Sequence, residues 1–342
     1  MLDRIVTFEK KRLRNCDLRL TEYVSTDNML SDFGGVRVAN RISKTGTSTS
    51  FIKGDILVSN IRPYLNKIWY ATFDGGCSPD VFVYRAKKNI VTSPFLYNIL
   101  ANKAFITYVM NGAKGVKMPR GDKEQMMKYP CSIPSLQEQD KISSLLKFID
   151  ERIATQRRLI DKLETLIKGI AEFLTTKTPN TKIADCLVCH SSTLQENQIG
   201  SYGKYRVYGA SGICGYSDLP EVTVDSILIV KDGSGVGSVA YRNGEYSVIG
   251  TSNYLTAKSG YLLRYLYYCL MCFNFTPYKT GMAIPHIYFK DYGKAKIYCP
   301  SIEEQKKIAV TLSNIESKIK IERTILQQYA MQKQHFLQHL FI

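Results

Sequence analysis

Residues 142–174, ISSLLKFIDERIATQRRLIDKLETLIKGIAEFL, decide how this chain folds. Side chains recur there in steps of four and three, which is the spacing of the contact seam in a coiled coil. Every seam position is apolar except Gln156. The seam positions are Ile142, Leu146, Ile149, Ile153, Gln156, Ile160, Leu163, Ile167, Ile170 and Leu174. The stretch therefore predicts a long helix, from Gln137 to Thr176, that packs against another helix.

The start of this helix and its seam both occur a second time. At residues 134–138, Pro-Ser is followed by Glu138 at the spacing of a capping box, in which side chains satisfy free backbone N–H groups. Residues 300–304 repeat this pattern 166 positions later. The second seam is Ile308, Leu312, Ile315, Ile319, Glu322, Leu326, Tyr329, Lys333, Phe336 and Leu340. Even the polar interruption returns, because Glu322 stands at the position of Gln156.

The repeat extends beyond the two helices. Residues 115–119 (GVKMP) match residues 281–285 (GMAIP) at the same offset, and segments 56–58 and 68–70 match 227–229 and 239–241 at an offset of 171. Self-similarity of this kind indicates a duplicated structural unit. We divide the chain into a first globule (residues 1–134), a first rod (135–178), a second globule (179–300) and a second rod (301–342).

The rods are predicted to pack against each other as an antiparallel coiled coil, with one globule at each end. That pairing would relate the two halves of the chain by a pseudo-twofold axis. Since each globule mixes strand-like and helix-like segments, the predicted fold class is α+β, with two α/β domains joined and separated by the two long helices.

The chain is strongly basic. Lys and Arg number 46 against 30 Asp and Glu, which gives a net charge of +16 in 342 residues. The surplus lies mostly in residues 1–132, which carry 21 basic and 11 acidic side chains, whereas the rods are nearly neutral. A polyanion such as DNA is the partner that this pattern favours, with globules on nucleic acid and rods on protein. The alternative is that the charge serves solubility alone.

The sequence also bears on location. The first ten residues include four charged ones, so we expect no signal peptide, and the longest apolar run, 261–275, contains Arg264 and is too short to span a membrane. The odd number of cysteines, nine, indicates free thiols. We therefore expect a cytoplasmic protein without membrane contact.

The first globule contains a predicted hairpin with polar residues at its tip. Residues 56–59 are expected to form a buried strand, residues 60–63 a turn, and residues 67–70 the returning strand. The residues predicted to contact DNA from this tip are Ser59, Asn60, Arg62 and Lys67. Arg62 suits a guanine edge or a phosphate, and its alternative is a surface ion pair with Asp55 or Asp80.

A basic loop follows the hairpin in the same globule. The apolar pattern from Ser93 to Met110 predicts a helix, and residues 111–120 after it hold glycines and three cations without an acidic residue. Flexible basic loops let donors approach phosphates closely. Lys114, Lys117 and Arg120 are therefore predicted to bind DNA.

The second globule repeats this arrangement with other side chains. Residues 205–216 alternate aromatic residues with glycines, as in strands joined by tight turns, and the glycine-rich run 231–237 follows the strand 227–230. That run resembles a nucleotide-binding fingerprint, but a strand-like segment follows it where a helix would be needed, so we interpret it as the second hairpin tip. Residues 261–275 predict the matching helix, and the loop follows. The predicted DNA contacts are Lys231, Ser234, Tyr278, Lys279 and His286.

Two cysteine spacings suggest cofactors but are weak signals. Residues 186–190 spell Cys-Leu-Val-Cys-His, the haem-attachment pattern, in a single copy, and Cys269 and Cys272 lie in an apolar helix where packing is the commoner role. We predict neither haem nor zinc.

The motifs of several enzyme classes are missing from the sequence. It has no Asp/Asn-Pro-Pro-aromatic motif of amino-methyltransferases, no phosphate loop ending in Gly-Lys-Ser/Thr, and no acidic-x-Lys partner for Pro79-Asp80 as in metal-dependent nucleases. We predict a binding protein without catalytic residues. Two rival classes are an enzyme with an unrecognised site and a stand-alone DNA-binding coiled-coil protein without methyltransferase partners.

Taken together, these features resemble the specificity subunit of type I restriction-modification systems. The resemblance is carried by the alternation of globules and rods, the helix starts at 134–139 and 300–305, Gly-Asp-Ile-Leu-Val-Ser at 54–59, and Tyr-Gly-Ala-Ser-Gly-Ile-Cys-Gly-Tyr at 208–216. It implies two target-recognition domains that each read half of a split DNA sequence, and helices that dock two modification subunits. It also implies that S-adenosylmethionine, ATP and Mg belong to partner modification and restriction subunits, with no cofactor in this chain.

Overall fold

The computed structural model describes residues 1–115 and 117–341 and divides into two compact units. Unit 1 comprises Met1–Gln156 with Ile325–Ile342, and unit 2 comprises Arg157–Thr324. Val116, in the predicted basic loop, and Ile342, at the end of the second rod, lie outside the described residues. The division falls within the two long helices, so each unit holds one globule and a segment of each helix.

The two long helices begin where the sequence predicts. They are α4 (Leu136–Thr175) and α8 (Ile302–His339). The Oγ atom of Ser135 accepts a hydrogen bond from the Glu138 N–H (3.3 Å), and the Oγ atom of Ser301 accepts one from the Glu304 N–H (3.4 Å). Serine thus caps both helices, while the carboxylate of Glu304 pairs with Lys177 at 3.7 Å.

Segments of α4 and α8 run antiparallel within each unit. In unit 1, Gln139 of α4 binds Thr92, the N-cap of α1 (Ser93–Leu100), and Phe341, just after α8, packs on Phe95 of α1. Asp150 of α4 pairs with Lys333 of α8 at 2.5 Å. In unit 2, Glu164 pairs with Arg323 at 2.6 Å. All predicted seam side chains, from Ile142 to Leu174 and from Ile308 to Leu340, are buried or half-buried, as expected of a helix–helix contact.

The globule of unit 1 has two antiparallel-rich sheets. The first has the order β1-β8-β5-β6, and the second has the order β2-β4-β7-β3, in which β3 and β7 pair in parallel. The bounds are β1 (Val6–Phe8), β2 (Arg12–Arg14), β3 (Tyr23–Val24), β4 (Thr47–Phe51), β5 (Ile56–Ser59), β6 (Ile68–Tyr70), β7 (Gly75–Cys77) and β8 (Val81–Ala86). The pairing of β5 with β6 confirms the predicted first hairpin.

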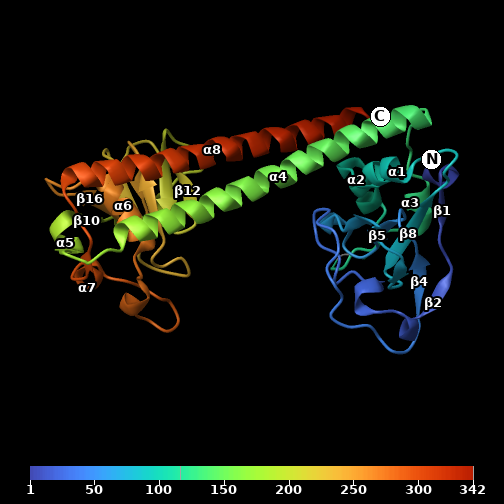
Figure 1. Cartoon of the computed structure of the whole chain (residues 1–342), viewed down its shortest axis with the longest axis horizontal. Coiled ribbons are helices and arrows are strands. Elements are labelled where there is room, and N and C mark those ends of the chain that lie inside the picture. Colours follow the sequence, from blue (N-terminus) through green and yellow to red (C-terminus); the bar gives the residue numbers. More distant parts are fainter. Residues whose placement is uncertain (116, 342) are drawn as a thin grey trace. The chain divides into compact units, whose positions relative to one another are not determined.

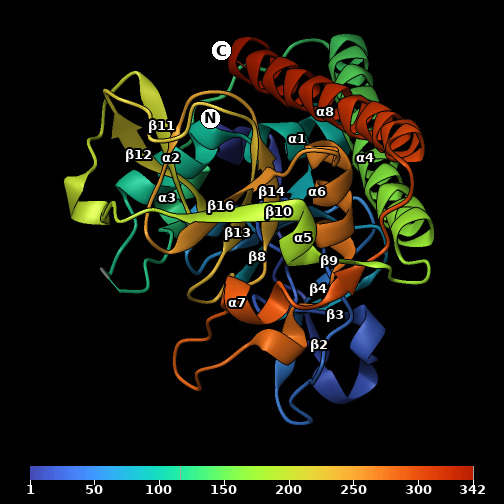
Figure 2. The ribbon, with the colours of Figure 1, turned by 90° about the vertical axis from the view of Figure 1, so that its left-hand side faces the viewer.

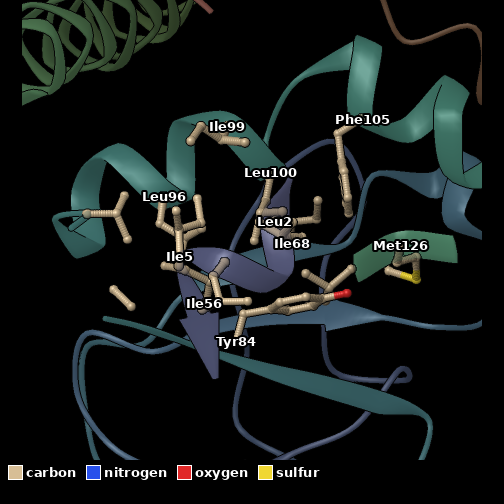
Figure 3. Close-up of a cluster of buried hydrophobic side chains, with 14 of the residues drawn as sticks. Leu2, Ile5, Ile56, Ile68, Tyr84, Leu96, Ile99, Leu100, Phe105 and Met126 are labelled. Atoms are coloured by element: carbon tan, nitrogen blue, oxygen red, sulfur yellow. The ribbon is translucent and has the colours of Figure 1, made fainter. Parts of the chain in front are cut away.

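Helices α1 and α2 (Lys103–Asn111) cover the first sheet, as Figure 1 shows. Figure 3 shows the core between them, in which Ile56 and Tyr84 of the sheet meet Leu96 and Leu100 of α1. Leu57, on the other face of β5, packs instead with Phe51 and the second sheet. Because β5 has a core on both sides, all four of its side chains are buried.

The predicted helix from Ser93 to Met110 is wrong as a single element. It breaks between α1 and α2 at Ala101 and Asn102. Asn102 caps α2, because its Oδ1 accepts a hydrogen bond from the Ala104 N–H (3.0 Å), and its Nδ2 donates to the Leu337 carbonyl of α8 (2.7 Å). The break thus lets one side chain serve two helices.

The globule of unit 2 has the same plan. Its main sheet has the order β10-β16-β13-β14, all antiparallel, and a smaller sheet has the order β12-β11-β15, with β11 and β15 parallel. The bounds are β10 (Leu187–Ser191), β11 (Tyr205–Gly209), β12 (Gly212–Ser217), β13 (Ser226–Val230), β14 (Val239–Arg242), β15 (Ser247–Val248) and β16 (Ser252–Ala257). Figure 2 shows α6 (Leu263–Cys272) between the main sheet and α8. The predicted strands 205–216 and the second hairpin are confirmed.

Short elements complete both units. They are α3 (Lys123–Met127), β9 (Thr181–Lys182), α5 (Ile183–Cys186), α7 (Phe289–Tyr292) and β17 (Lys296–Ile297), with 3-10 turns η1 (Leu2–Arg4), η2 (Asn15–Asp17), η3 (Leu20–Glu22), η4 (Pro63–Leu65), η5 (Glu196–Gln198) and η6 (Thr276–Tyr278). In residues 1–115 and 117–341 no helix is both long and apolar enough to cross a membrane. All nine cysteines are free, and the described residues contain no metal-binding cluster of His, Cys, Asp or Glu.

A buried glutamine joins each globule to the start of its long helix, and sequence reasoning missed this role. Gln139 is 0% exposed; its Oε1 accepts from the Thr92 N–H, and its Nε2 donates to two carbonyls. Gln305, 166 residues later and 2% exposed, accepts from the Leu262 N–H in the same way and donates to the Pro300 carbonyl. The signal in the sequence was the Glu-Gln pair that the two helix starts share.

Candidate nucleic-acid interface

The predicted hairpin tip and basic loop of the first globule form one surface, here called the first tip (residues 59–67 and 111–121). The Arg62 N–H donates to the Pro119 carbonyl (2.8 Å), and the Gly121 N–H donates to the Asn60 carbonyl (3.1 Å). Lys114 and Arg120 exchange two backbone hydrogen bonds of 2.9 Å, which close the loop into a small hairpin. The backbone therefore holds together two segments that are far apart in the sequence.

The second globule builds the same frame, here called the second tip (residues 230–238 and 277–287). The Gly233 N–H donates to the Pro285 carbonyl (3.0 Å), and the Ile287 N–H donates to the Lys231 carbonyl (2.9 Å). Thr280 and His286 exchange backbone bonds of 2.9 and 2.8 Å. Each bond repeats one of the first tip at the offsets of 171 and 166 that the sequence shows.

Apart from Lys67, the predicted cations of the first tip divide into two pairs. Lys114 lies 2.7 Å from Asp122, whose hydrogen bond raises the pKa of Lys114, and Arg120 lies 3.6 Å from Asp80. Arg62 and Lys117 are exposed and make no ion pair within the part of the chain that the structure describes. The loop itself lacks acidic residues, but neighbouring segments supply two carboxylates.

The alternative role of Arg62 as a partner of Asp55 or Asp80 is wrong. Asp55 accepts hydrogen bonds from the Nε and Nη2 atoms of Arg85, at 2.8 and 2.7 Å, and is 1% exposed. Asp80 faces Arg120. The guanidinium of Arg62 is therefore left to the solvent face.

Two residues predicted at the surface of the first tip lie inside it. Ser59 is 2% exposed, and its hydroxyl donates to the Ile61 carbonyl at 3.0 Å. Lys67 is half-buried, and its Nζ donates to the Thr26 carbonyl at 2.6 Å. Ser59 is buried because β5 is covered on both faces, and Lys67 ties the tip to the segment at Thr26. The predicted outward position of both side chains is corrected. Asn60 is half-buried, and its Oδ1 has no hydrogen-bond partner among the described residues.

The predicted side chains of the second tip differ in exposure. Ser234 and Lys279 are exposed, and Lys231 is half-buried. Tyr278 is half-buried and stacks on Phe273, with ring centroids 5.7 Å apart. The Nδ1 atom of His286 lies 3.2 Å from the Ile284 carbonyl, inside the closed loop. Only part of the predicted set thus faces outward, and DNA contact by any of these residues stays a prediction.

Apolar side chains at the tip of the second loop were missed by sequence reasoning. Met282 is fully exposed and Ile284 is 66% exposed. In the first tip, Met118 is exposed at the place of Ile284. The signal was present in the matched segments GVKMP and GMAIP, which carry apolar residues although they lie in loops. Both tips therefore combine cations with exposed apolar residues.

The comparison with known proteins agrees with this architecture. The model of the type I restriction modification DNA specificity domain matches residues 19–165 and 167–329. The specificity subunit of the type I restriction enzyme EcoDI from Escherichia coli is 32% identical over 98 residues, which cover 29% of this chain and 21% of that subunit.

Solved structures share the fold. The S subunit of a type I restriction-modification system from M. genitalium superposes with a TM-score of 0.65 at 17% identity, over 100% of this chain and 95% of that one. A chain from work on complex assembly and conformational transition of the type I R-M system gives 0.60 at 17% identity, over 96% of both chains. With two family domains that together span most of its length, the chain belongs to the type I restriction-modification DNA specificity family.

Proposed function

We propose that this chain is the non-catalytic DNA-recognition subunit of a type I restriction-modification complex, and that it reads a two-part target with its two tips. The observation that carries the proposal is the pair of tips: one backbone frame is built twice, yet the outward side chains differ. Two frames of equal shape with unlike side chains suit two half-sites of unlike sequence. Contacts to bases determine which sequence is read, whereas contacts to the DNA backbone position the protein.

The charge of the first tip supports contact with nucleic acid. Arg62 and Lys117 are exposed cations without an ion pair in the described ranges, and the loop that carries Lys117 is closed by backbone bonds. Cations in a fixed loop can contact DNA phosphates, and each such contact makes the affinity for DNA fall as the salt concentration rises. Lys114 and Arg120 are exposed as well and keep this role open, although carboxylates face them.

Partners and cofactors are proposed on the family membership. The helices α4 and α8 dock two modification subunits, and restriction subunits join that assembly. S-adenosylmethionine, ATP and Mg are held by those partners, while this chain binds double-stranded DNA. Copurification with a modification subunit distinguishes this proposal from a stand-alone DNA-binding protein.

The test is the methylated motif of the reconstituted complex, read by single-molecule sequencing of DNA from a host without other methylation. The expected motif has two specified parts and an unspecified gap, and it disappears when this chain is omitted. Methylation of an undivided motif would contradict the proposal, as would DNA methylation or cleavage by this chain alone.

Helix length offers a second test. We propose that α4 and α8 set the gap between the half-sites. One extra heptad in each helix preserves the seam and adds about 10 Å of helix, which equals roughly three base pairs of DNA. The motif should keep both half-sites and gain a longer gap. An unchanged gap with full activity would show that the helices only dock partners.

A further inference from the structure

The two hairpin tips share an unusual backbone conformation but not the residues that adopt it. Between β13 and β14, Gly233 and Gly237 have φ values of +96° and +88°. At the same places between β5 and β6 stand Arg62 and Asn66, with φ values of +49° and +54°. Glycine adopts left-handed conformations readily, whereas residues with a Cβ are disfavoured there. The first tip therefore holds two side chains where the second tip uses glycine.

These positions belong to one strained cluster. In residues 1–115 and 117–341, the non-glycine residues with positive φ are Asp32, Phe33, Arg62 and Asn66. The Asp32 N–H donates to the Leu65 carbonyl and the Phe33 N–H donates to the Asn66 carbonyl, both at 3.0 Å. Strained backbone of this kind gathers at functional sites, where the surrounding structure holds it in place.

The fold accounts for one of the two side chains of the first tip. The Nδ2 atom of Asn66 donates to the Oδ1 atom of Asp32 at 2.9 Å, so Asn66 holds the two loops together. The guanidinium of Arg62 makes no hydrogen bond or ion pair within the described ranges, and the side chain is exposed. Gly233 shows that the frame closes without it, because its N–H makes the same bond as that of Arg62.

We propose that Arg62 is the specificity-determining residue of the first tip and reads a guanine of the first half-site from the major groove, whereas the second tip reads its half-site without a side chain at this place. The inference rests on the function proposed above. An arginine donates two parallel hydrogen bonds to guanine O6 and N7, which requires a fixed direction. The left-handed backbone, followed by Pro63 and anchored to Pro119, fixes that direction.

A phosphate contact would not need this arrangement. A cation on an unstrained loop residue reaches a phosphate in many orientations, and Lys117 in the same tip has that freedom. Strain at Arg62 is therefore better explained by a contact that depends on angle.

The test compares Arg62→Gly, which installs the residue of the second tip, with Arg62→Lys and with Lys117→Ala as the phosphate-contact control. Each full-length variant is measured for its thermal unfolding midpoint and, in the reconstituted complex, for its methylated motif. We expect Arg62→Gly to unfold at a higher temperature than the wild type, because strain is relieved. Its motif should become degenerate at one G·C pair of one half-site, with the other half-site unchanged.

The control variants distinguish the charge of the Arg62 side chain from the directed pair of hydrogen bonds that its guanidinium can donate. Arg62→Lys keeps the charge but loses the fork, so it should show the same degeneracy, and Lys117→Ala should lower methylation at all sites without degeneracy. An unchanged motif in Arg62→Gly, a uniform loss without degeneracy, or a lower unfolding temperature would each overturn the inference while the wild-type motif upholds the proposed function. A wild-type complex with no two-part motif would overturn both.

Discussion

The two units carry an acidic residue at equivalent positions of their long helices, but the partners of the two acids differ. Asp150 of α4 and Glu316 of α8 are 166 residues apart. In unit 1, Asp150 pairs with Lys333, so the acid joins helix to helix. In unit 2, Glu316 accepts hydrogen bonds from Arg264, Tyr267 and Tyr268 of α6, so the acid joins helix to globule.

One position that contributes to this difference is Arg264. Arg264 lies two residues after the backbone N–H that Gln305 binds, and Pro94 occupies the equivalent place after the N–H that Gln139 binds. Arg264 also stacks on Tyr241, at 4.3 Å from the ring centre. Proline carries no charge, so the helix–globule junction of unit 1 uses the hydrogen bond of Asn102 and the contact of Phe95 with Phe341 instead. Both junctions keep the glutamine, whereas the charged contact between helix and globule is found in unit 2.

The glutamines that both junctions share should show the largest effect. Gln139→Ala leaves three backbone groups without their partner and should lower the stability of unit 1 by about 3 kcal/mol. Gln305→Ala leaves two and should lower that of unit 2 by about 2 kcal/mol. Gln137→Ala, on the exposed face of α4, is the control and should be neutral. Hydrogen exchange measured separately for each unit gives these values. Equal and negligible losses would show that the shared junction is not held by these amides.

The acids that differ between the junctions should give a smaller, unequal pair of effects. Glu316→Gln weakens three hydrogen bonds around the half-buried Arg264 and should cost unit 2 about 1–2 kcal/mol. Asp150→Asn removes a single ion pair that is more exposed, and it should cost unit 1 about 0.5 kcal/mol. Denaturant unfolding with a probe in each unit measures both. A larger loss from Asp150→Asn would reverse the comparison drawn above.

The serine caps should give small effects of equal size. Ser135→Ala and Ser301→Ala each remove one cap bond at an exposed helix start and should cost about 0.5–1 kcal/mol. Thermal unfolding of the single variants and the double variant tests whether the caps act alike. A clear difference between them would mean that the two helix starts are less equivalent than their sequences.

The sequence predicts most of the architecture because duplication supplies an internal control. The offsets of 166 and 171 identified the two hairpins, the two loops and both helix starts, and Gly233 and Arg62 fall at the same place in the structure. Local sequence patterns do not predict features that depend on contact with a segment far away in the sequence. The helix break at Asn102 depends on the Leu337 carbonyl, and the partners of Lys114 and Arg120 come from outside their loop.

The candidate site was predicted less well than the fold. The apolar run at 56–58 predicts a buried strand, but it does not show that the burial extends to Ser59 at the start of the turn. No sequence rule marks Arg62 as left-handed, since that conformation is imposed by η4 and by the loop at Pro119. The exposure of Met282 and Ile284 could not be predicted, because apolar residues in a loop suggest burial.

The composition of unit 1 has a consequence for synthesis. Its globule is made early, yet Asn102 and Phe95 find their partners in Leu337 and Phe341, more than two hundred residues downstream. Unit 2 is continuous from Arg157 to Thr324 and needs no such delay. On the ribosome, unit 2 therefore completes its contacts before unit 1 does, although the first globule emerges first. Until residues 325–341 arrive, the nascent first globule exposes an apolar helix face, which is a natural place for a chaperone to bind.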